Sequence, residues 1–174
     1  LADLDGSNLE QKLSIEPKIL GNRMNDAKCD PNGVLFAGTM GDGISPTGSL
    51  YRIDSQEFKK VCSEVTVSNG LGWSPDGSKM YYIDSAKASV QVSDFDVSNS
   101  SIIGFKDFIE FPTSFGIPDG MCTDREGGIW VAFFGGKQVR RFSADGVQTH
   151  EIQLPVPQIT SCCFAGEDST TLYI

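Results

Sequence analysis

The chain has 174 residues, of which 39% are hydrophobic, and it carries a formal charge of −9 at pH 7. That share of hydrophobic residues is typical of a folded domain and argues against wholesale disorder. The acidic charge argues against nucleic acid and anionic membrane surfaces as partners, because both require a cationic face.

Cysteine and histidine usage narrows the chemistry further. The five cysteines include an adjacent pair, Cys162 and Cys163, and no CxxC spacing occurs. An odd count of this kind favours buried free thiols in a reducing cytoplasm over a disulfide scaffold or a zinc site. The single histidine, His150, excludes a metal site built from several histidines, and its surroundings predict a surface position.

The predicted elements are short strands separated by Gly, Pro, Asp and Asn, with almost no helical periodicity. Three segments share a glycine-containing turn followed by a β-branched and aromatic strand: CDPNGVLFAGT (29–39), WSPDGSKMYYID (73–84) and TDREGGIWVAFF (123–134). A fourth, CFAGEDSTTLYI (163–174), has a degraded turn before the same kind of strand. Further strands are predicted at 48–54, 89–96 and 137–143.

These segments recur with a regular period. Phe36, Tyr82, Trp130 and Tyr173 sit at matching places, separated by 46, 48 and 43 residues. Units of about four strands and about 45 residues are typical of propeller blades. A β-sandwich with irregular strands is the alternative, but it does not require a register that returns at this interval. We therefore predict an all-β propeller, with residues 1–174 forming a single domain.

One polar side chain recurs at the same register in three of these units. Counting back five residues from the start of each turn gives Asn25, Asn69 and Asp119. The innermost strands of a propeller surround a central channel, so equivalent positions on them converge. One carboxylate and two amide oxygens suit a hard cation such as Ca²⁺.

An ordinary turn is the simpler explanation for any one of these positions taken alone. Asn-Gly and Asp-Gly, as in Asn69-Gly70 and Asp119-Gly120, are among the commonest turn dipeptides. Three polar residues at one register nevertheless favour a shared central site.

Four stretches resemble the regucalcin family, also known as the senescence marker protein, gluconolactonase and luciferin-regenerating enzyme family. They are NRMNDAKCDPNGVLFAGTM (22–40), SNGLGWSPDGSKMYYIDS (68–85), IPDGMCTDREGGIWVAFFGG (117–136) and TSCCFAG (160–166). The loop GDGISPTGSLYRI (41–53) is similar to the insect branch. The resemblance implies a six-bladed propeller. At about 45 residues a blade, we expect about four blades here, with the first blade and the end of the last blade missing.

The resemblance also implies a divalent metal in the central channel, with calcium the first expectation and zinc, manganese or magnesium as alternatives. Asn69 and Asp119 match two family metal ligands, and Asp119 also matches the proposed proton-transfer residue. Arg23 and Asn25 match substrate contacts, whereas Asp42 lies near a family acidic contact in a loop of different length. The family's remaining ligand, a glutamate of the first blade, has no match in this sequence.

The function expected from this resemblance is metal-dependent hydrolysis of a small lactone in the cytoplasm, with no obligate protein partner. We expect this activity of the full-length protein and not of these 174 residues alone. One alternative is a non-enzymatic calcium-binding regulator, and another is a hydrolase of the luciferin-regenerating type. A third is a propeller that serves only as a protein-interaction platform, but a pure scaffold has no need of a polar ring in its channel.

Overall fold

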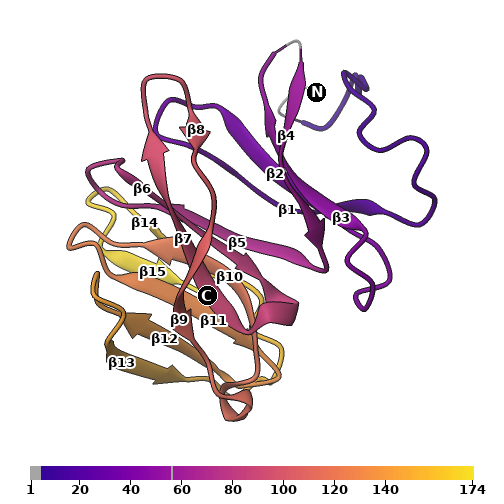
Figure 1. Cartoon of the computed structure of the whole chain (residues 1–174). Coiled ribbons are helices and arrows are strands. Elements are labelled where there is room, and N and C mark those ends of the chain that lie inside the picture. Colours follow the sequence, from indigo (N-terminus) through magenta and orange to yellow (C-terminus); the bar gives the residue numbers. More distant parts are fainter. Residues whose placement is uncertain (1–4, 56) are drawn as a thin grey trace.

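The structure, a computed structural model, describes residues 5–55 and 57–174, which form three large antiparallel sheets and a hairpin (Figure 1). The first sheet contains β1 (Arg23–Cys29), β2 (Leu35–Met40), β3 (Gly48–Ile53) and β4 (Phe58–Val65). The second contains β5 (Ser68–Trp73), β6 (Lys79–Asp84), β7 (Ser89–Asp96), β8 (Ser101–Ile102) and β9 (Lys106–Glu110). The third contains β10 (Ile117–Thr123), β11 (Ile129–Phe134), β12 (Gln138–Phe142) and β13 (Gln148–Gln153). The hairpin pairs β14 (Cys163–Ala165) with β15 (Thr171–Tyr173).

The chain winds through the first and third sheets from one strand to its neighbour, as in propeller blades. The second sheet departs from this order because both β8 and β9 pair with β7. Short 3₁₀ helices span Ser85–Lys87 and Thr113–Phe115. In the part of the chain that the structure describes, no helix is long and apolar enough to cross a membrane.

The predicted glycine-containing turns join the first two strands of each large sheet. In the third sheet, the Asp124 carboxylate accepts hydrogen bonds from the backbone N–H groups of Glu126 at 3.0 Å and Gly128 at 2.7 Å. Gly127 lies between them with φ of +81°, a backbone conformation that favours glycine. The repeated turn therefore sets where each inner strand ends and the next strand begins.

The aromatic repeat markers are partly out of register, which corrects the spacing predicted from the sequence. Tyr173 is displaced by one residue, because Leu172, which pairs with Phe164, is the counterpart of Phe36 in the hairpin. Phe36 pairs with Lys28 and Trp130 with Cys122, at equivalent places, but their counterpart in the second sheet is Tyr81 instead of Tyr82. The reason is a longer turn in the second sheet, where the backbone N–H of residue 74 bonds to the carbonyl of residue 79. In the first sheet the same bond spans residues 30 to 34.

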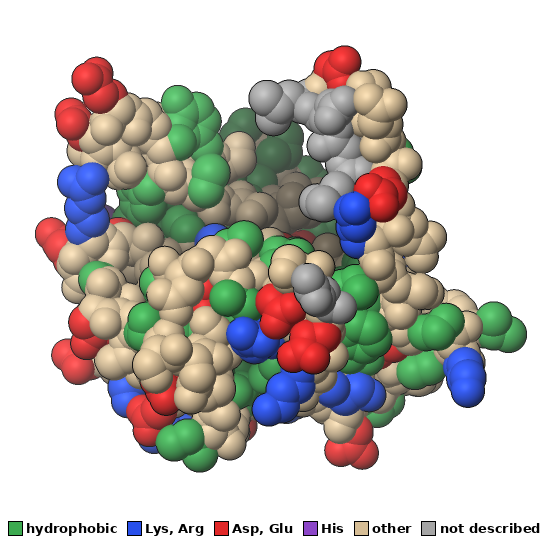
Figure 2. Space-filling model, turned by 90° about the horizontal axis from the view of Figure 1, so that it is seen from above, with side chains coloured by type: hydrophobic (Ala, Val, Ile, Leu, Met, Phe, Trp, Pro, Cys, Tyr) green, Lys and Arg blue, Asp and Glu red, His purple; other side chains and the backbone are tan. Residues whose placement is uncertain are grey.

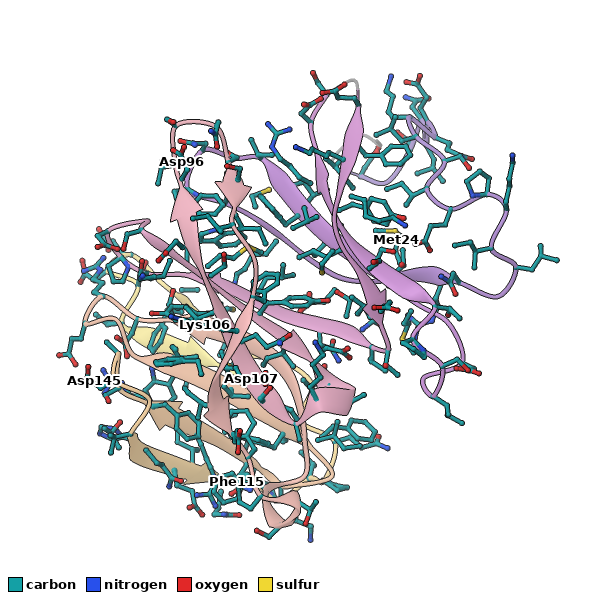
Figure 3. The ribbon with its side chains drawn as sticks, viewed as in Figure 1. Met24, Asp96, Lys106, Asp107, Phe115 and Asp145 are labelled. Atoms are coloured by element: carbon teal, nitrogen blue, oxygen red, sulfur yellow. The ribbon has the colours of Figure 1, made fainter. Side chains whose placement is uncertain are left out.

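Three hydrophobic clusters hold neighbouring sheets together. The cluster between the first and second sheets consists of Phe36, Leu50, Val65, Leu71, Trp73, Met80, Tyr82 and Phe95. The cluster between the second and third sheets consists of Tyr81, Ile83, Val90, Val92, Ile109, Phe111, Met121, Ile129, Val131, Phe133 and Phe142. A smaller cluster joins the third sheet to the hairpin region through Cys122, Ala132, Val139, Ile159 and Cys162. The stick view shows side chains filling the space between sheets, with Phe115 at the edge near β12 (Figure 3).

Candidate functional site

The inner strands of the three sheets lie side by side, with β5 between β1 and β10. Each is interrupted by an irregularity of pairing at the same place, between Met24 and Ala27, between Ser68 and Leu71, and between Pro118 and Met121. Such bulges bend a strand and redirect side chains, and they are frequent next to active sites. The residues inside the irregularities are Asn25-Asp26, Asn69-Gly70 and Asp119-Gly120.

The bulges bring the predicted side chains to one cavity of about 170 Å³. It is lined by Asn25, Asp26, Asn69, Asp119, Thr160 and Ser161. The convergence of positions 25, 69 and 119 predicted from the repeat is therefore present. Asn69 is buried, with 8% of its surface exposed, whereas Asn25 and Asp119 are half-buried.

A chain of hydrogen bonds ties the three sheets together beside this cavity. The Asn25 Nδ2 group donates to the Ser68 carbonyl at 2.8 Å and to Asn69 Oδ1 at 3.0 Å. Asn69 Nδ2 in turn donates to Ser85 Oγ at 2.8 Å, and the Ser85 hydroxyl donates to the Pro118 carbonyl at 2.6 Å. Since both amides have fixed partners, the orientation of their oxygens is set by the protein.

Glycine is required where the inner strands approach each other. A Cβ on Gly70 would lie 2.8 Å from the Asp119 carbonyl oxygen, closer than side-chain carbons normally come. A Cβ on Gly120 would lie 2.7 Å from the Thr160 carbonyl oxygen, to which the Gly120 N–H donates a hydrogen bond of 2.8 Å. The two glycines therefore allow neighbouring backbones to touch beside the polar residues.

The Asp119 carboxyl has an unusual proton affinity. Burial, together with the charge of Asp26, raises the pKa of Asp119 to about 6, although the Gly120 N–H opposes the shift. Burial also raises the pKa of Asp26, and the nearby Lys28 ammonium partly offsets that shift. Lys28 is fixed by a hydrogen bond of 3.0 Å to the Met121 carbonyl. The site thus holds two acidic groups whose charged forms are disfavoured in the absence of a cation.

The predicted substrate contacts take different positions. Arg23 is exposed, and its Nη1 donates to Asn25 Oδ1 at 2.8 Å and to the Met24 carbonyl at 3.1 Å, so it adjoins the cavity through Asn25. Asp42 accepts hydrogen bonds from the backbone N–H groups of Ile44 and Ser45, and it closes its own loop. Asp42 is not among the residues that line the cavity.

The donors at the cavity suit a hard divalent cation. Among the described residues, no three His, Cys, Asp or Glu side chains gather in a way that could hold a metal. The cavity instead offers carboxylates from Asp26 and Asp119 and amide oxygens from Asn25 and Asn69. Oxygen donors of this mixture are those that calcium accepts, and a cation would relieve the repulsion between the carboxylates.

The prediction from sequence missed three residues that line the cavity, Asp26, Thr160 and Ser161. Asp26 occupies the position that Gly70 and Gly120 occupy in the other two inner strands. The sequence could have indicated it, because a carboxylate replaces the glycine that follows the polar residue in those two strands. Ser161 lies five residues before Gly166, which opens the fourth turn. Counting back five residues from the start of the turn, as for Asp119, would therefore have identified Ser161 as a candidate for the cavity.

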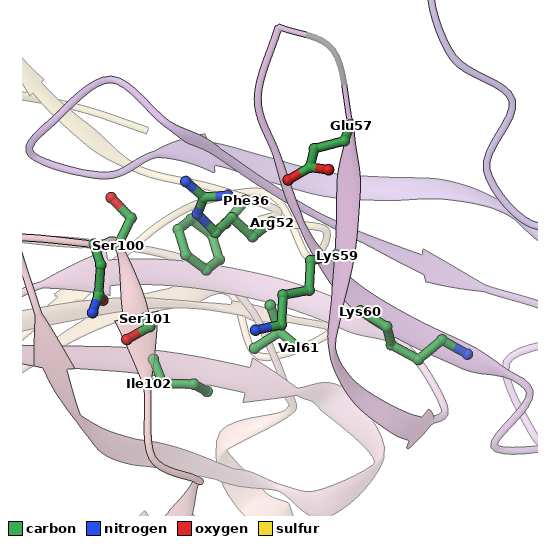
Figure 4. Close-up of a pocket in the computed structure, with 10 residues that line it drawn as sticks. Phe36, Arg52, Glu57, Lys59, Lys60, Val61, Ser100, Ser101 and Ile102 are labelled. Carbon is green, nitrogen blue, oxygen red and sulfur yellow. The ribbon is translucent and has the colours of Figure 1, made fainter.

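A larger cleft of about 440 Å³ lies elsewhere, between the outer strands of the first and second sheets. Seen from above, the molecule is hollowed between two raised parts (Figure 2). In the close-up, Arg52, Glu57 and Lys59 face Ser101 and Ile102 of the neighbouring sheet (Figure 4). The Arg52 guanidinium is paired outside the lining residues, since its Nη1 lies 3.3 Å from an Asp54 carboxylate oxygen. The repeated bulges do not reach this cleft, so the smaller cavity is the better candidate.

Comparison with known proteins agrees with the geometry. The family model described as SMP-30/gluconolactonase/LRE-like region matches residues 1–174. Regucalcin of Oryctolagus cuniculus is 37% identical over 180 residues, which cover 99% of this chain and 60% of that protein. The chain therefore spans less than two thirds of the length of this relative.

Two solved structures are similar in fold as well as in sequence. A luciferin-regenerating enzyme is 39% identical with a TM-score of 0.88, over 93% of this chain and 58% of that one. A calcium-binding protein, regucalcin of Agrobacterium tumefaciens, is 31% identical with a TM-score of 0.86, over 91% of this chain and 54% of that one. The all-β propeller architecture predicted from the repeat is thereby confirmed, and the chain belongs to the SMP-30/gluconolactonase/LRE-like family.

Proposed function

We propose that the protein carrying this chain is a divalent-metal-dependent hydrolase of a small lactone, with calcium as the first choice of metal. The observation that carries the proposal is the cavity at the three bulges, where Asn69 and Asp119 meet and the pKa of Asp119 is raised to about 6. Membership of a family that includes gluconolactonases supports a lactone as the substrate class.

Asp119 is the residue that we assign to proton transfer. Burial raises the pKa of Asp119 in the metal-free site to about 6, and a bound cation would lower it, so that Asp119 is a carboxylate able to accept a proton at neutral pH. Asp119 would accept the proton of the attacking water and return it to the departing hydroxyl. Burial and, after it, the Asp26 charge raise the pKa of Asp119 in the metal-free site, which makes Asp26 part of the same acid–base unit.

Arg23 and Asn25 would bind the substrate. Arg23 uses one guanidinium nitrogen to hold Asn25 and the Met24 carbonyl, and the exposed position of its side chain suits contact with oxygens of a lactone. Asn25 is fixed by Ser68 and Asn69, so it would orient a ligand without moving. Thr160 and Ser161 add hydroxyls at the opposite wall of the cavity.

Asn69 and Asp119 would hold the metal, with Asp26 as an additional carboxylate within the same cavity. A bound divalent cation would polarise the lactone carbonyl and lower the pKa of a nearby water. Because Asp119 has two carboxylate oxygens, one would serve the metal while the other accepts the proton.

The test is lactone hydrolysis followed by acid release, with and without chelator, in the full-length wild-type protein and in its Asp119→Ala variant. We expect turnover to require the metal and to fall by at least about 100-fold in the variant, which loses a general base. Asp145→Ala is the matched control because Asp145 (Figure 3) is an exposed carboxylate in the turn between β12 and β13 and does not line the cavity. Near-normal turnover in Asp119→Ala would remove this mechanism.

A second candidate function is calcium binding without catalysis. It is favoured by the similarity to a structure described as a calcium-binding protein, and it would use the same oxygen donors. Tight calcium binding without hydrolysis across a panel of small lactones would support this function over the hydrolase. The luciferin-regenerating type of hydrolase remains a related alternative for the substrate, given the similarity to that enzyme.

A further inference from the structure

Two buried cysteines from different parts of the fold face each other beneath the candidate site. Cys122 lies on β10, Cys162 directly precedes β14, and their Sγ atoms are 3.7 Å apart. Their exposed fractions are 5% and 4%, and both belong to the cluster that joins the third sheet to the hairpin. Cys29 and Cys163, in contrast, are exposed.

The surrounding backbone already holds this pair in place. The Gly120 N–H donates to the Thr160 carbonyl at 2.8 Å, two residues before each cysteine. A disulfide has an S–S length of about 2.0 Å, so the two sulfurs need to approach by roughly 1.7 Å. Rotation of the side chains together with a small backbone adjustment supplies such a movement, and the neighbouring sheets need not separate.

We propose that Cys122 and Cys162 form a redox pair that hydrogen peroxide converts into a disulfide between the third sheet and the hairpin region. The Cys122 thiolate attacks one peroxide oxygen, which gives a sulfenic acid as the O–O bond breaks and the other oxygen leaves as water after protonation. The Cys162 sulfur then attacks the sulfenic sulfur, the S–S bond forms, and a second water leaves. Two thiols are oxidised, one peroxide is reduced, and two waters are produced.

The two sulfurs differ in a way that suits these roles. The hydrogen bond between them lowers the pKa of Cys122 and, together with burial, raises the pKa of Cys162. Cys162 Sγ also donates to the Trp130 carbonyl at 3.6 Å, which holds the proton on that thiol. Cys122 is therefore the first nucleophile, because the thiolate is the form that attacks peroxide. Cys162 is the resolving thiol, which reacts once the sulfenic acid has formed beside it.

The hairpin determines both how an oxidant reaches the two cysteines and what the disulfide does to the cavity. β14 and β15 have three residues each, and their side chains are exposed or half-buried, so local opening there would admit a small oxidant. The disulfide would fix Ser161, next to Cys162, relative to Asp119, three residues before Cys122. Oxidation would thus make one wall of the cavity rigid.

The experiment is peroxide treatment of the folded protein, followed by unfolding, alkylation and peptide mass analysis. We expect the wild-type protein to lose two of its five alkylatable thiols, and a peptide pair joined through Cys122 and Cys162 to appear, lighter than the two reduced peptides by about 2 Da. Cys163→Ser should give the same pair, whereas Cys122→Ser should abolish it. Amide exchange at Gly120 should be slower in the oxidised protein.

The opposite pattern would overturn the proposal. It would consist of full alkylation of Cys122 and Cys162 after treatment, while the exposed Cys29 and Cys163 are oxidised. Loss of the joined peptide in Cys163→Ser, which would place the linkage on Cys163, would also contradict it. The readout on the wild-type protein does not require any variant to fold, and it does not depend on the proposed hydrolase activity.

Discussion

Gly70→Ala tests whether the inner strands approach each other as closely as the structure shows. The new Cβ would lie 2.8 Å from both the Asp119 carbonyl oxygen and Met121 Cγ, and 3.0 Å from Ile83 Cδ1. Comfortable carbon contacts begin at about 3.5 Å, so β5 and β10 must separate by several tenths of an ångström. Because Asp119 belongs to the strand that moves, the change should disturb both folding and the cavity.

The change in the free energy of unfolding caused by Gly70→Ala is the sum of two opposing effects. Overpacking of this kind costs about 1–3 kcal/mol. Alanine also reduces the entropy of the unfolded chain, which returns about 0.5–1 kcal/mol. Crowding should win, with a net loss of about 1–2 kcal/mol and a melting temperature lower by about 4 °C for a domain of this size. Urea and thermal unfolding followed by circular dichroism measure both quantities.

Gly72→Ala is the matched control, since Gly72 lies on the same strand. Its Cβ would meet only the ends of two side chains, Thr123 Cγ2 at 3.2 Å and Met121 Cε at 3.9 Å. These groups can shift, so we expect a change within about 0.5 kcal/mol. Equal stability of Gly70→Ala and Gly72→Ala would refute the close approach of β5 and β10.

Three further predictions concern ionised and hydrogen-bonded side chains. Burial raises the pKa of Asp124, but hydrogen bonds from Arg141 and Trp130 lower it more, so the net shift is downward. The contribution of Asp124 to the stability of the fold is therefore present above about pH 4 and is lost as pH falls through the folded-state pKa. Asp124→Asn should therefore cost about 3 kcal/mol at pH 7 in urea unfolding and little at pH 2, and an equal cost at both pH values would contradict the ion pair. The raised pKa of Asp119 gives the opposite pH dependence of stability. With chelator present, the free energy of unfolding should rise as pH falls from 7 towards 4, and Asp119→Asn should weaken this rise. A double-mutant cycle of Asn25→Ala and Asn69→Ala should give a coupling of about 1 kcal/mol for their 3.0 Å hydrogen bond, whereas additive effects would argue against that bond.

The repeat made the architecture predictable because each blade carries the same turn. Aspartate or serine opens that turn and glycine closes it, so the end of each inner strand can be read from the sequence. The alignment of strands between blades was harder to predict, since Tyr81 and not Tyr82 is the counterpart of Phe36. The turn before Tyr82 has one residue more than the turn before Phe36, and aromatic residues on adjacent positions concealed the shift.

The site was predictable at the positions that share a register and less so elsewhere. Asn25, Asn69 and Asp119 were identified because they lie at a fixed distance from a recognisable turn. The role of Asp26 depends on burial and on its charge near Asp119, which only the packed strands reveal. The contact between Cys122 and Cys162 joins residues that are far apart in the sequence, and no spacing rule predicts it.

Calorimetric titration of Ca²⁺ into the protein tests most directly whether the inner strands build a single cation site. We expect one ion to bind, and we expect Asn69→Ala and Asp119→Asn each to weaken its binding by at least about tenfold, since each removes one oxygen donor or one charge. Asp145→Asn should bind Ca²⁺ as the wild-type protein does, because the Asp145 carboxylate is exposed and does not line the cavity. Calcium affinity that is unchanged in both Asn69→Ala and Asp119→Asn would contradict a shared site at the bulges.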